Sequence, residues 1–160
     1  MAREFIVIPN QTVEPGADVL FESDGFVFNR GVFHNGGSGL FKLASPNVLG
    51  FRCPMRGIPV ASYVVSFHGN ILIPTDGTVG EVSLTLIQDG VTDTASQMLA
   101  TPTAVEIAEN VGAGIIVSVP WICRCSNVAL RNTSDQAIEI VNGTLIIGDP
   151  SLGYLREGVF

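Results

Sequence analysis

The histidines are the first side chains in this sequence that could do chemistry, as general bases or metal ligands. They are His34 and His68, and each lies in a strand-like run, where a surface or hydrogen-bonded imidazole is more common than a catalytic one. No Gly-x-Ser-x-Gly elbow supplies a serine nucleophile, because the glycine-rich segment 35–39 lacks that spacing. The sequence therefore predicts no catalytic residue and no enzyme.

Cysteines are the next candidates, as zinc ligands or as disulfides. A zinc site needs about four ligands, and the pair in Cys123-Arg124-Cys125 has no second pair to complete it. With Cys53 the count is odd, which argues against a disulfide framework. Buried free thiols are the interpretation, and no metal site is predicted.

Carboxylates and glycines complete the set of candidate groups. Asp18, Glu22 and Asp24 are the densest acidic group, and a solvated strand face with a turn explains them; calcium at acidic loops stays an open alternative. Segment 35–39 resembles a phosphate cradle, but no helix follows to direct its N-terminus at an anion. No cofactor is predicted.

The composition indicates a protein that associates with itself. Of its 160 residues 46% are apolar and only 14% are charged, so one small domain has more apolar surface than it can hide. The formal net charge is −7 and the arginines are scattered, which excludes nucleic acid as a partner.

No segment is predicted to enter a membrane. The apolar run before Pro9 is too short for a signal peptide, and no run reaches the roughly 18 apolar residues of a membrane span. The expectation is synthesis in a host cytoplasm without export.

Short strands must position these residues. Segment 62–73 alternates with Tyr63, Val65 and Phe67 on one face, and segment 81–86 alternates in the same way. Segment 137–147 is long and apolar; its Asn142-Gly143 pair closes a hairpin or marks a bulge, and the bulge is favoured.

Two segments stay open between strand and helical turn, 91–99 and 102–110, and segment 44–59 is predicted to be the longest loop. About ten short strands without a long amphipathic helix predict an all-β, two-sheet antiparallel sandwich or jelly roll. The expected division is an N-terminal strand or arm (1–12), one jelly-roll domain (13–148) and a C-terminal tail (149–160).

Four motifs occur in the order typical of one known family. They are a glycine-rich turn into a strand (35–43), Tyr63-Val64-Val65-Ser66-Phe67, a strand ending in Asp89-Gly90 (84–90), and a closing hairpin (130–147). The sequence resembles the jelly-roll family of tumour necrosis factor and the complement globular heads, especially its bacterial and phage members. It departs from the family in lacking a Gly-x-y collagen stalk and in its long irregular segment 44–59.

The resemblance implies a homotrimer. The candidates for the trimer interface or the core are the strand-alternating apolar residues Phe41, Tyr63, Val65, Phe67, Leu84, Leu86, Ile138 and Ile140. The candidates for docking a partner are Trp121 at a strand end and Tyr154, Leu155 and Phe160 in the tail, for which ordinary fraying is the alternative.

A short member without a stalk most resembles small phage virion proteins. The sequence-based hypothesis is a structural virion protein, a trimeric capsid decoration or head-fibre module, whose partners are its own copies and a capsid or other virion protein. The alternative is a receptor-binding or glycan-binding adhesive module on a virion or a bacterial or spore surface, with host surface glycan as its partner.

Overall fold

The computed structural model describes most of the chain. The described residues are 2–21, 32–34, 39–44, 58–120, 125–148 and 151–155. They form eleven strands and no helix, so no described helix could cross a membrane. The strands are β1 (Ala2–Ile8), β2 (Gln11–Val13), β3 (Val32–His34), β4 (Leu40–Ala44), β5 (Ile58–Leu72), β6 (Val82–Gln88), β7 (Val91–Ala100), β8 (Glu109–Pro120), β9 (Cys125–Asn132), β10 (Ile138–Gly148) and β11 (Ser151–Leu155).

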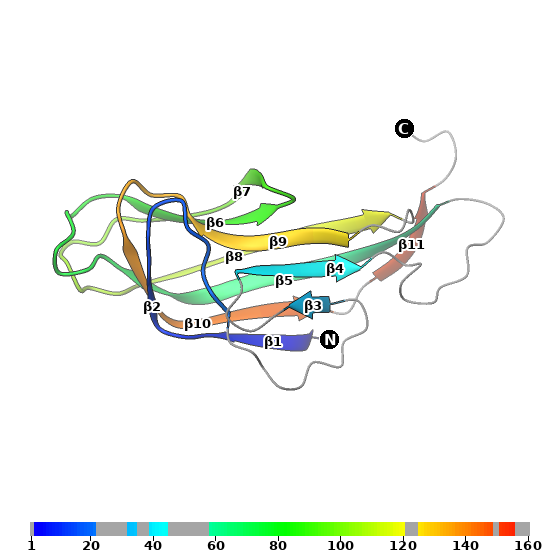
Figure 1. The fold of residues 1–160 in the computed structure, drawn as a ribbon, viewed down its shortest axis with the longest axis horizontal. Coiled ribbons are helices and arrows are strands. Elements are labelled where there is room, and N and C mark those ends of the chain that lie inside the picture. Colours follow the sequence, from blue (N-terminus) through cyan, green and yellow to red (C-terminus); the bar gives the residue numbers. More distant parts are fainter. Residues whose placement is uncertain are drawn as a thin grey trace.

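The strands form two antiparallel sheets, as the sequence predicts. Sheet A has six strands: β1, β10, β5 and β11 follow one another, β2 also pairs with β10, and β8 pairs with β5. Sheet B has five strands in the order β3, β4, β9, β6, β7. The chain crosses between the sheets from β4 to β5 and from β9 to β10, which makes a jelly-roll sandwich. Figure 1 shows the strands along the long axis, with the β5–β6, β7–β8 and β9–β10 connections gathered at one end.

The core lies between the sheets and is built by strand alternation. In β5 the aromatic and branched side chains of Tyr63, Val65 and Phe67 are fully buried, while the residues between them face outward. Sheet B supplies Phe41, Leu84 and Leu86 from its inner side; the Phe21 and Phe41 rings pack edge to face, with centroids 5.8 Å apart.

The two segments left open by the sequence adopt different structures. Segment 91–100 is strand β7, whereas residues 101–108 form turns before β8 begins. Glu106 has a positive φ of 59°, and its amide donates to the Ile73 carbonyl at 2.8 Å. The sequence could not reveal this turn because nothing in an Ala-Val-Glu-Ile run marks a left-handed residue.

Asn142-Gly143 forms a bulge within one strand. The β5–β10 register shifts between Val141 and Thr144, so Asn142 and Gly143 together oppose Gly69, and β10 continues on both sides. The predicted bulge is confirmed and the hairpin alternative is wrong.

Both ends of the chain contribute strands to sheet A. β1 pairs with β10 from Ala2 to Ile8, and β11 pairs with the first part of β5 from Ser151 to Leu155. The predicted long loop falls between the end of β4 at Ala44 and the start of β5 at Ile58, and residues 45–57 lie outside the described residues.

Candidate interaction surface

The outward side of β5 and β8 is the candidate site. We call it the uncharged face. It consists of outward-facing residues of β5, their partners on β8, and two residues of β10: Ser62, Val64, Ser66, His68, Asn70, Asn110, Gly112, Gly114, Ile116, Ser118, Thr144 and Ile146.

An aliphatic pair lies at the centre of the β5–β8 ladder. Val64 is directly opposite Ile116, and these side chains are 50% and 70% exposed, although cross-strand aliphatic pairs normally gain stability by burial. Next to them the hydroxyls of Ser62 and Ser118 share a hydrogen bond of 3.0 Å.

Two glycines keep β8 flat on this side. A Cβ at Gly112 would lie 3.1 Å from His68 Nδ1, and one at Gly114 would lie 3.3 Å from Ser66 Oγ. The β5 side chains therefore lean over β8 backbone, and a larger residue at either position would push them aside.

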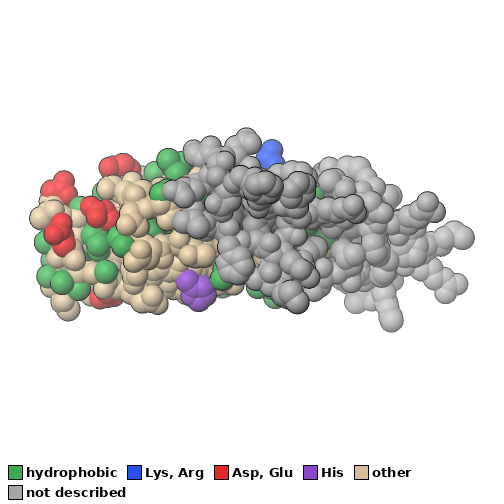
Figure 2. All heavy atoms as spheres, turned by 90° about the horizontal axis from the view of Figure 1, so that it is seen from below, with side chains coloured by type: hydrophobic (Ala, Val, Ile, Leu, Met, Phe, Trp, Pro, Cys, Tyr) green, Lys and Arg blue, Asp and Glu red, His purple; other side chains and the backbone are tan. Residues whose placement is uncertain are grey.

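None of the residues that form the face carries a carboxylate, an ammonium or a guanidinium group. The sequence has no Asp, Glu, Lys or Arg between Ile58 and Ile73 or between Asn110 and Pro120. Described acidic residues gather instead at the end with the β5–β6, β7–β8 and β9–β10 connections, where Figure 2 shows acidic side chains among apolar ones. They are Glu14, Asp76, Glu81, Glu106, Glu109, Asp135 and Glu139.

The free edge of β8 adjoins the face. β8 pairs with β5 over twelve positions, from Val60–Pro120 to Ile71–Glu109, without a register shift, and among the described strands it has no partner on its other side. Natural edge strands are usually protected by bulges, charges, proline or shortness. Between Asn110 and Val119 this edge has none of these.

The other sheet edges do carry such protection. β1 has a register shift between Ala2 and Glu4 and is followed by Pro9. On β7, residues 93–96 oppose Leu86 alone, and β2 and β3 have three residues each. Among the described edges β8 is thus the long regular one.

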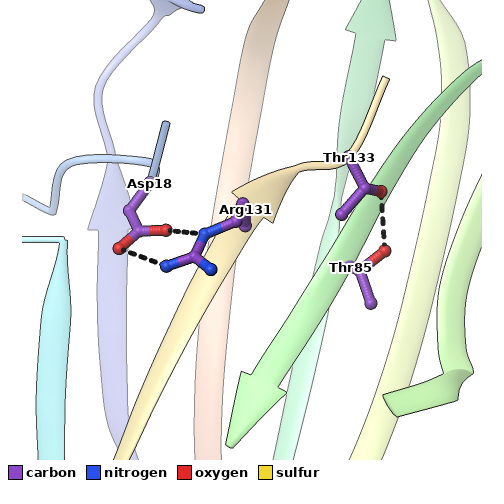
Figure 3. Close-up of polar contacts among 4 residues, drawn as sticks. All are labelled: Asp18, Thr85, Arg131 and Thr133. Atoms are coloured by element: carbon purple, nitrogen blue, oxygen red, sulfur yellow. Dashed lines mark hydrogen bonds and ion pairs between the residues drawn. The ribbon is translucent and has the colours of Figure 1, made fainter. Parts of the chain in front are cut away.

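The outward side of sheet B carries polar contacts within the chain (Figure 3), although the buried Oδ1 of Asn127 has no hydrogen-bond partner there among the described residues. Arg131 donates through Nε to Asp18 Oδ1 at 2.7 Å and through Nη2 to Oδ2 at 3.4 Å. Thr133 Oγ1 bonds with the hydroxyls of Thr85 at 2.8 Å and Ser83 at 2.7 Å, and both strand residues are buried. These bonds satisfy polar groups that burial would otherwise penalise.

Buried Asn132 ties the sheets together at the end of β9. Its Nδ2 donates to the carbonyls of Val13 and Gln136, both at 2.9 Å, and its Oδ1 accepts from the Ser134 amide at 2.9 Å. The residue is completely buried, its bond with Val13 is buried as well, and its bonds with Ser134 and Gln136 are part-buried.

The potential chemical groups are not brought together. Among the described residues no three His, Cys, Asp or Glu side chains could share a metal ion. His68 is on the uncharged face, His34 ends β3, and Cys125 is an exposed free thiol, contrary to the expected buried one. Cys53 and Cys123 lie outside the described residues.

Tyr63 has the one clearly shifted pKa among the described groups. Burial, and secondarily the charge of Cys125, raises the pKa of its phenol from 10.0 to about 12. Its hydroxyl donates to the Ala44 carbonyl at 3.3 Å. This hydrogen bond joins β5 of sheet A to β4 of sheet B.

The eight candidates for trimer interface or core are all fully buried within a single chain. They are Phe41, Tyr63, Val65, Phe67, Leu84, Leu86, Ile138 and Ile140. They therefore have no surface left to offer to another copy. Of the candidate docking residues, Tyr154 and Leu155 pair with Pro59 and Ile58 in β11, while Trp121 and Phe160 lie outside the described residues.

Sequence reasoning missed the exposed pair of the uncharged face. The available signal was the doublets Val64-Val65 and Ile115-Ile116. Consecutive strand residues point to opposite sides, so one member of each doublet has to leave the core.

Comparison with known proteins adds a fold likeness. No family model and no curated protein matches the chain. One similar solved structure is described as CBM35 from Cellvibrio japonicus Abf62, with 9% identity, a TM-score of 0.37, and coverage of 94% of this chain and 97% of that one. Another is Xyl-CBM35 in complex with a glucuronic acid containing disaccharide, with 10% identity, a TM-score of 0.35, and coverage of 96% and 99%. At TM-scores this low, neither likeness indicates what this protein binds.

Proposed function

We propose that the protein is a non-catalytic structural module that associates with copies of itself through the uncharged face and the adjoining β8 edge. The observation that carries the proposal is the exposed Val64–Ile116 pair at the centre of a surface without charge. Each copy has a formal charge of −7, so a surface without carboxylates is where identical copies can approach with the least repulsion.

The area of the surface indicates that the interface includes both the uncharged face and the free edge of β8. Twelve paired positions at about 3.4 Å each, across three strands about 4.8 Å apart, give a face on the order of 500 Å². A stable interface takes about 800 Å² from each partner. The face alone falls short, and the free β8 edge supplies additional area and unpaired backbone groups.

The finer form of the proposal is a homotrimer within a virion, as a capsid decoration or head fibre. A closed ring with rotational symmetry is built by joining two different surfaces of each copy, and the face together with its adjoining edge supplies one of these two surfaces. The motif order of the sequence supports the same assembly. A capsid or other virion protein is then the second partner.

A second candidate function is glycan binding by the same face. Hydroxyl and amide groups of Ser62, Ser118, Asn70 and Asn110 flank the aliphatic pair, a combination that can hydrogen-bond and pack against an uncharged sugar. Aromatic rings that stack on sugars are missing from the described exposed side chains, since Phe21, Phe41, Tyr63 and Phe67 are all buried. Self-association is the preferred function because of the exposed Val64–Ile116 pair at the centre of a surface without carboxylates.

The test places a charge on one face or the other. Ile116→Lys puts an ammonium group at the centre of the uncharged face, and Leu40→Lys is the matched control, because Leu40 is 45% exposed on the outward side of sheet B. Sedimentation velocity should show an oligomer for the unmodified protein and for Leu40→Lys. Ile116→Lys should weaken association at least about 100-fold, since an unpaired charge would be buried.

The outcomes separate the two functions. A monomeric unmodified protein, or equal weakening by both variants, would contradict self-association through this face. If that monomer binds an uncharged glycan on an array and Ile116→Lys abolishes the signal, glycan binding is the function instead.

A further inference from the structure

His68 is the titratable side chain on the uncharged face. It is exposed, lies between Gly112 on β8 and Thr144 on β10 in the strand register, and its ring atoms Nδ1 and Cε1 lie 3.1 and 3.5 Å from the place of a Gly112 Cβ. The imidazole therefore lies over the β8 backbone, within the surface proposed to meet another copy.

No charged group faces this imidazole from the neighbouring strands. Its neighbours on β5 are Ser66 and Asn70, and those on β8 are Asn110, Gly112 and Gly114. The charged residue of β8 is Glu109, which is opposite Ile71 and so about 10 Å farther along β5. On β10 it faces Thr144, and the charged residue of that strand is Glu139, opposite Leu72 and so about 13 Å farther along β5.

The next strand, β1, adds no charge close by in the register. Val7 is opposite Thr144, and Glu4, with Arg3 before it, is opposite Ile147 toward the other end of β10. An imidazolium at position 68 would thus have no described carboxylate to pair with.

We propose that His68 makes self-association through the uncharged face pH-dependent, with the oligomer stable when the imidazole is neutral and dissociating when it is protonated. This inference rests on the proposed function. A neutral imidazole can be covered by another copy at little cost, whereas an unpaired imidazolium loses its hydration without compensation.

The direction of the effect is distinctive. Histidine side chains gain a proton as the pH falls from about 8 to about 5. Where association requires a protonated imidazole to lose its proton, the association constant falls about tenfold per pH unit for each such proton. Protonation of carboxylates has the opposite effect, because it reduces the repulsion between copies that each carry −7.

The experiment is sedimentation velocity of the full chain at about pH 8 and about pH 5.5, with near-ultraviolet circular dichroism to verify folding. His68→Gln keeps a neutral polar side chain, and His34→Gln is the matched control because these are the chain's two histidines. The unmodified protein and His34→Gln should dissociate at the lower pH, His68→Gln should stay associated, and His68→Lys should be dissociated at both.

Failure of this inference differs from failure of the proposed function. An unmodified protein that stays associated at both pH values, or a His68→Gln variant that dissociates like the unmodified protein, would overturn the role of His68 and leave self-association intact. A monomer at about pH 8 would overturn the proposed function and the inference with it.

Discussion

The two outward faces of the sandwich satisfy their side chains in different ways. On sheet B, the Asp18–Arg131 pair and the hydroxyls of Thr85 and Thr133 bond with groups of the same chain. On sheet A, Val64 and Ile116 are open to solvent in the middle of a regular, charge-free ladder. The outward face of sheet B bonds these polar groups within a single copy, with the Oδ1 of Asn127 as an exception, and the outward face of sheet A gains most from being covered.

Exposed apolar residues also occur on sheet B, but in a different setting. Leu40 is on β4 and Leu99 is on β7, at the two sides of β9 and β6, with Lys42 and Arg131 on the same outward side. Isolated exposed leucines are normal on soluble proteins. The two faces are therefore distinguished by whether charged residues surround the exposed apolar side chains, and not by the exposure of single residues.

The largest expected effect is on the free energy of unfolding, through Asn132 at the end of β9. Asn132→Ala should lower the free energy of unfolding by about 3 kcal/mol, because it removes three hydrogen bonds of a completely buried side chain, those with Val13, Ser134 and Gln136. The control Asn110→Ala, on the uncharged face, should change stability by less than about 0.5 kcal/mol. Urea unfolding measures both, and equal losses would show that the faces do not differ in this way.

The next largest effect is on the pH dependence of stability, through Tyr63 in the core between the two sheets. With a folded-state pKa of about 12 against 10.0, Tyr63 keeps its proton while the unfolded chain releases it, so stability should fall as the pH rises through this interval. The loss attributable to Tyr63 should reach about 2–3 kcal/mol at the upper end. Urea unfolding across the alkaline range should give a shallower decline for Tyr63→Phe.

The chain's other tyrosine provides the control for that measurement. Tyr154→Phe is the matched control, because it removes the other phenol of the chain and leaves the buried Tyr63 in place. The same slope in Tyr63→Phe and the unmodified protein would show that the phenol is not responsible.

The smallest effect compares one kind of bond on both faces. Thr85→Val removes a buried hydroxyl bonded to Thr133 and should cost about 1 kcal/mol, whereas Ser118→Ala removes an exposed hydroxyl bonded to Ser62 and should cost less than about 0.5 kcal/mol. Thermal unfolding followed by circular dichroism is sufficient. A greater loss in Ser118→Ala would reverse the distinction between the faces.

Alternation made the fold predictable from the sequence. Tyr63, Val65 and Phe67 recur every second residue, which defines β5 and the side of it that faces the core, and the same period defines β6. The structure of segment 102–110 was not decidable from the sequence, because its turn depends on the left-handed backbone conformation of Glu106. The side chain of Glu106 accepts a hydrogen bond through Oε1 from the Thr75 hydroxyl at 3.0 Å, a contact between residues far apart in the sequence.

The candidate surface was less predictable than the fold. The sequence indicated self-association from composition alone, but it directed attention to large residues such as Phe41 and Tyr63, which the second sheet covers completely. Which side of a strand remains uncovered depends on how the sheets pair over long sequence separations, and Val64 is next to Ile116 only through that pairing.

The pairing of β1 with β10 has a consequence for synthesis. Residues 2–8 pair with residues 143–148, so β1 leaves the ribosome without its partner and stays unpaired until the strands from β2 to β9 have been translated and β10 follows. Long-range pairing of this kind slows folding and leaves strand edges open in the meantime. The nascent chain therefore has to keep β1 from associating with other molecules while the eight intervening strands are translated.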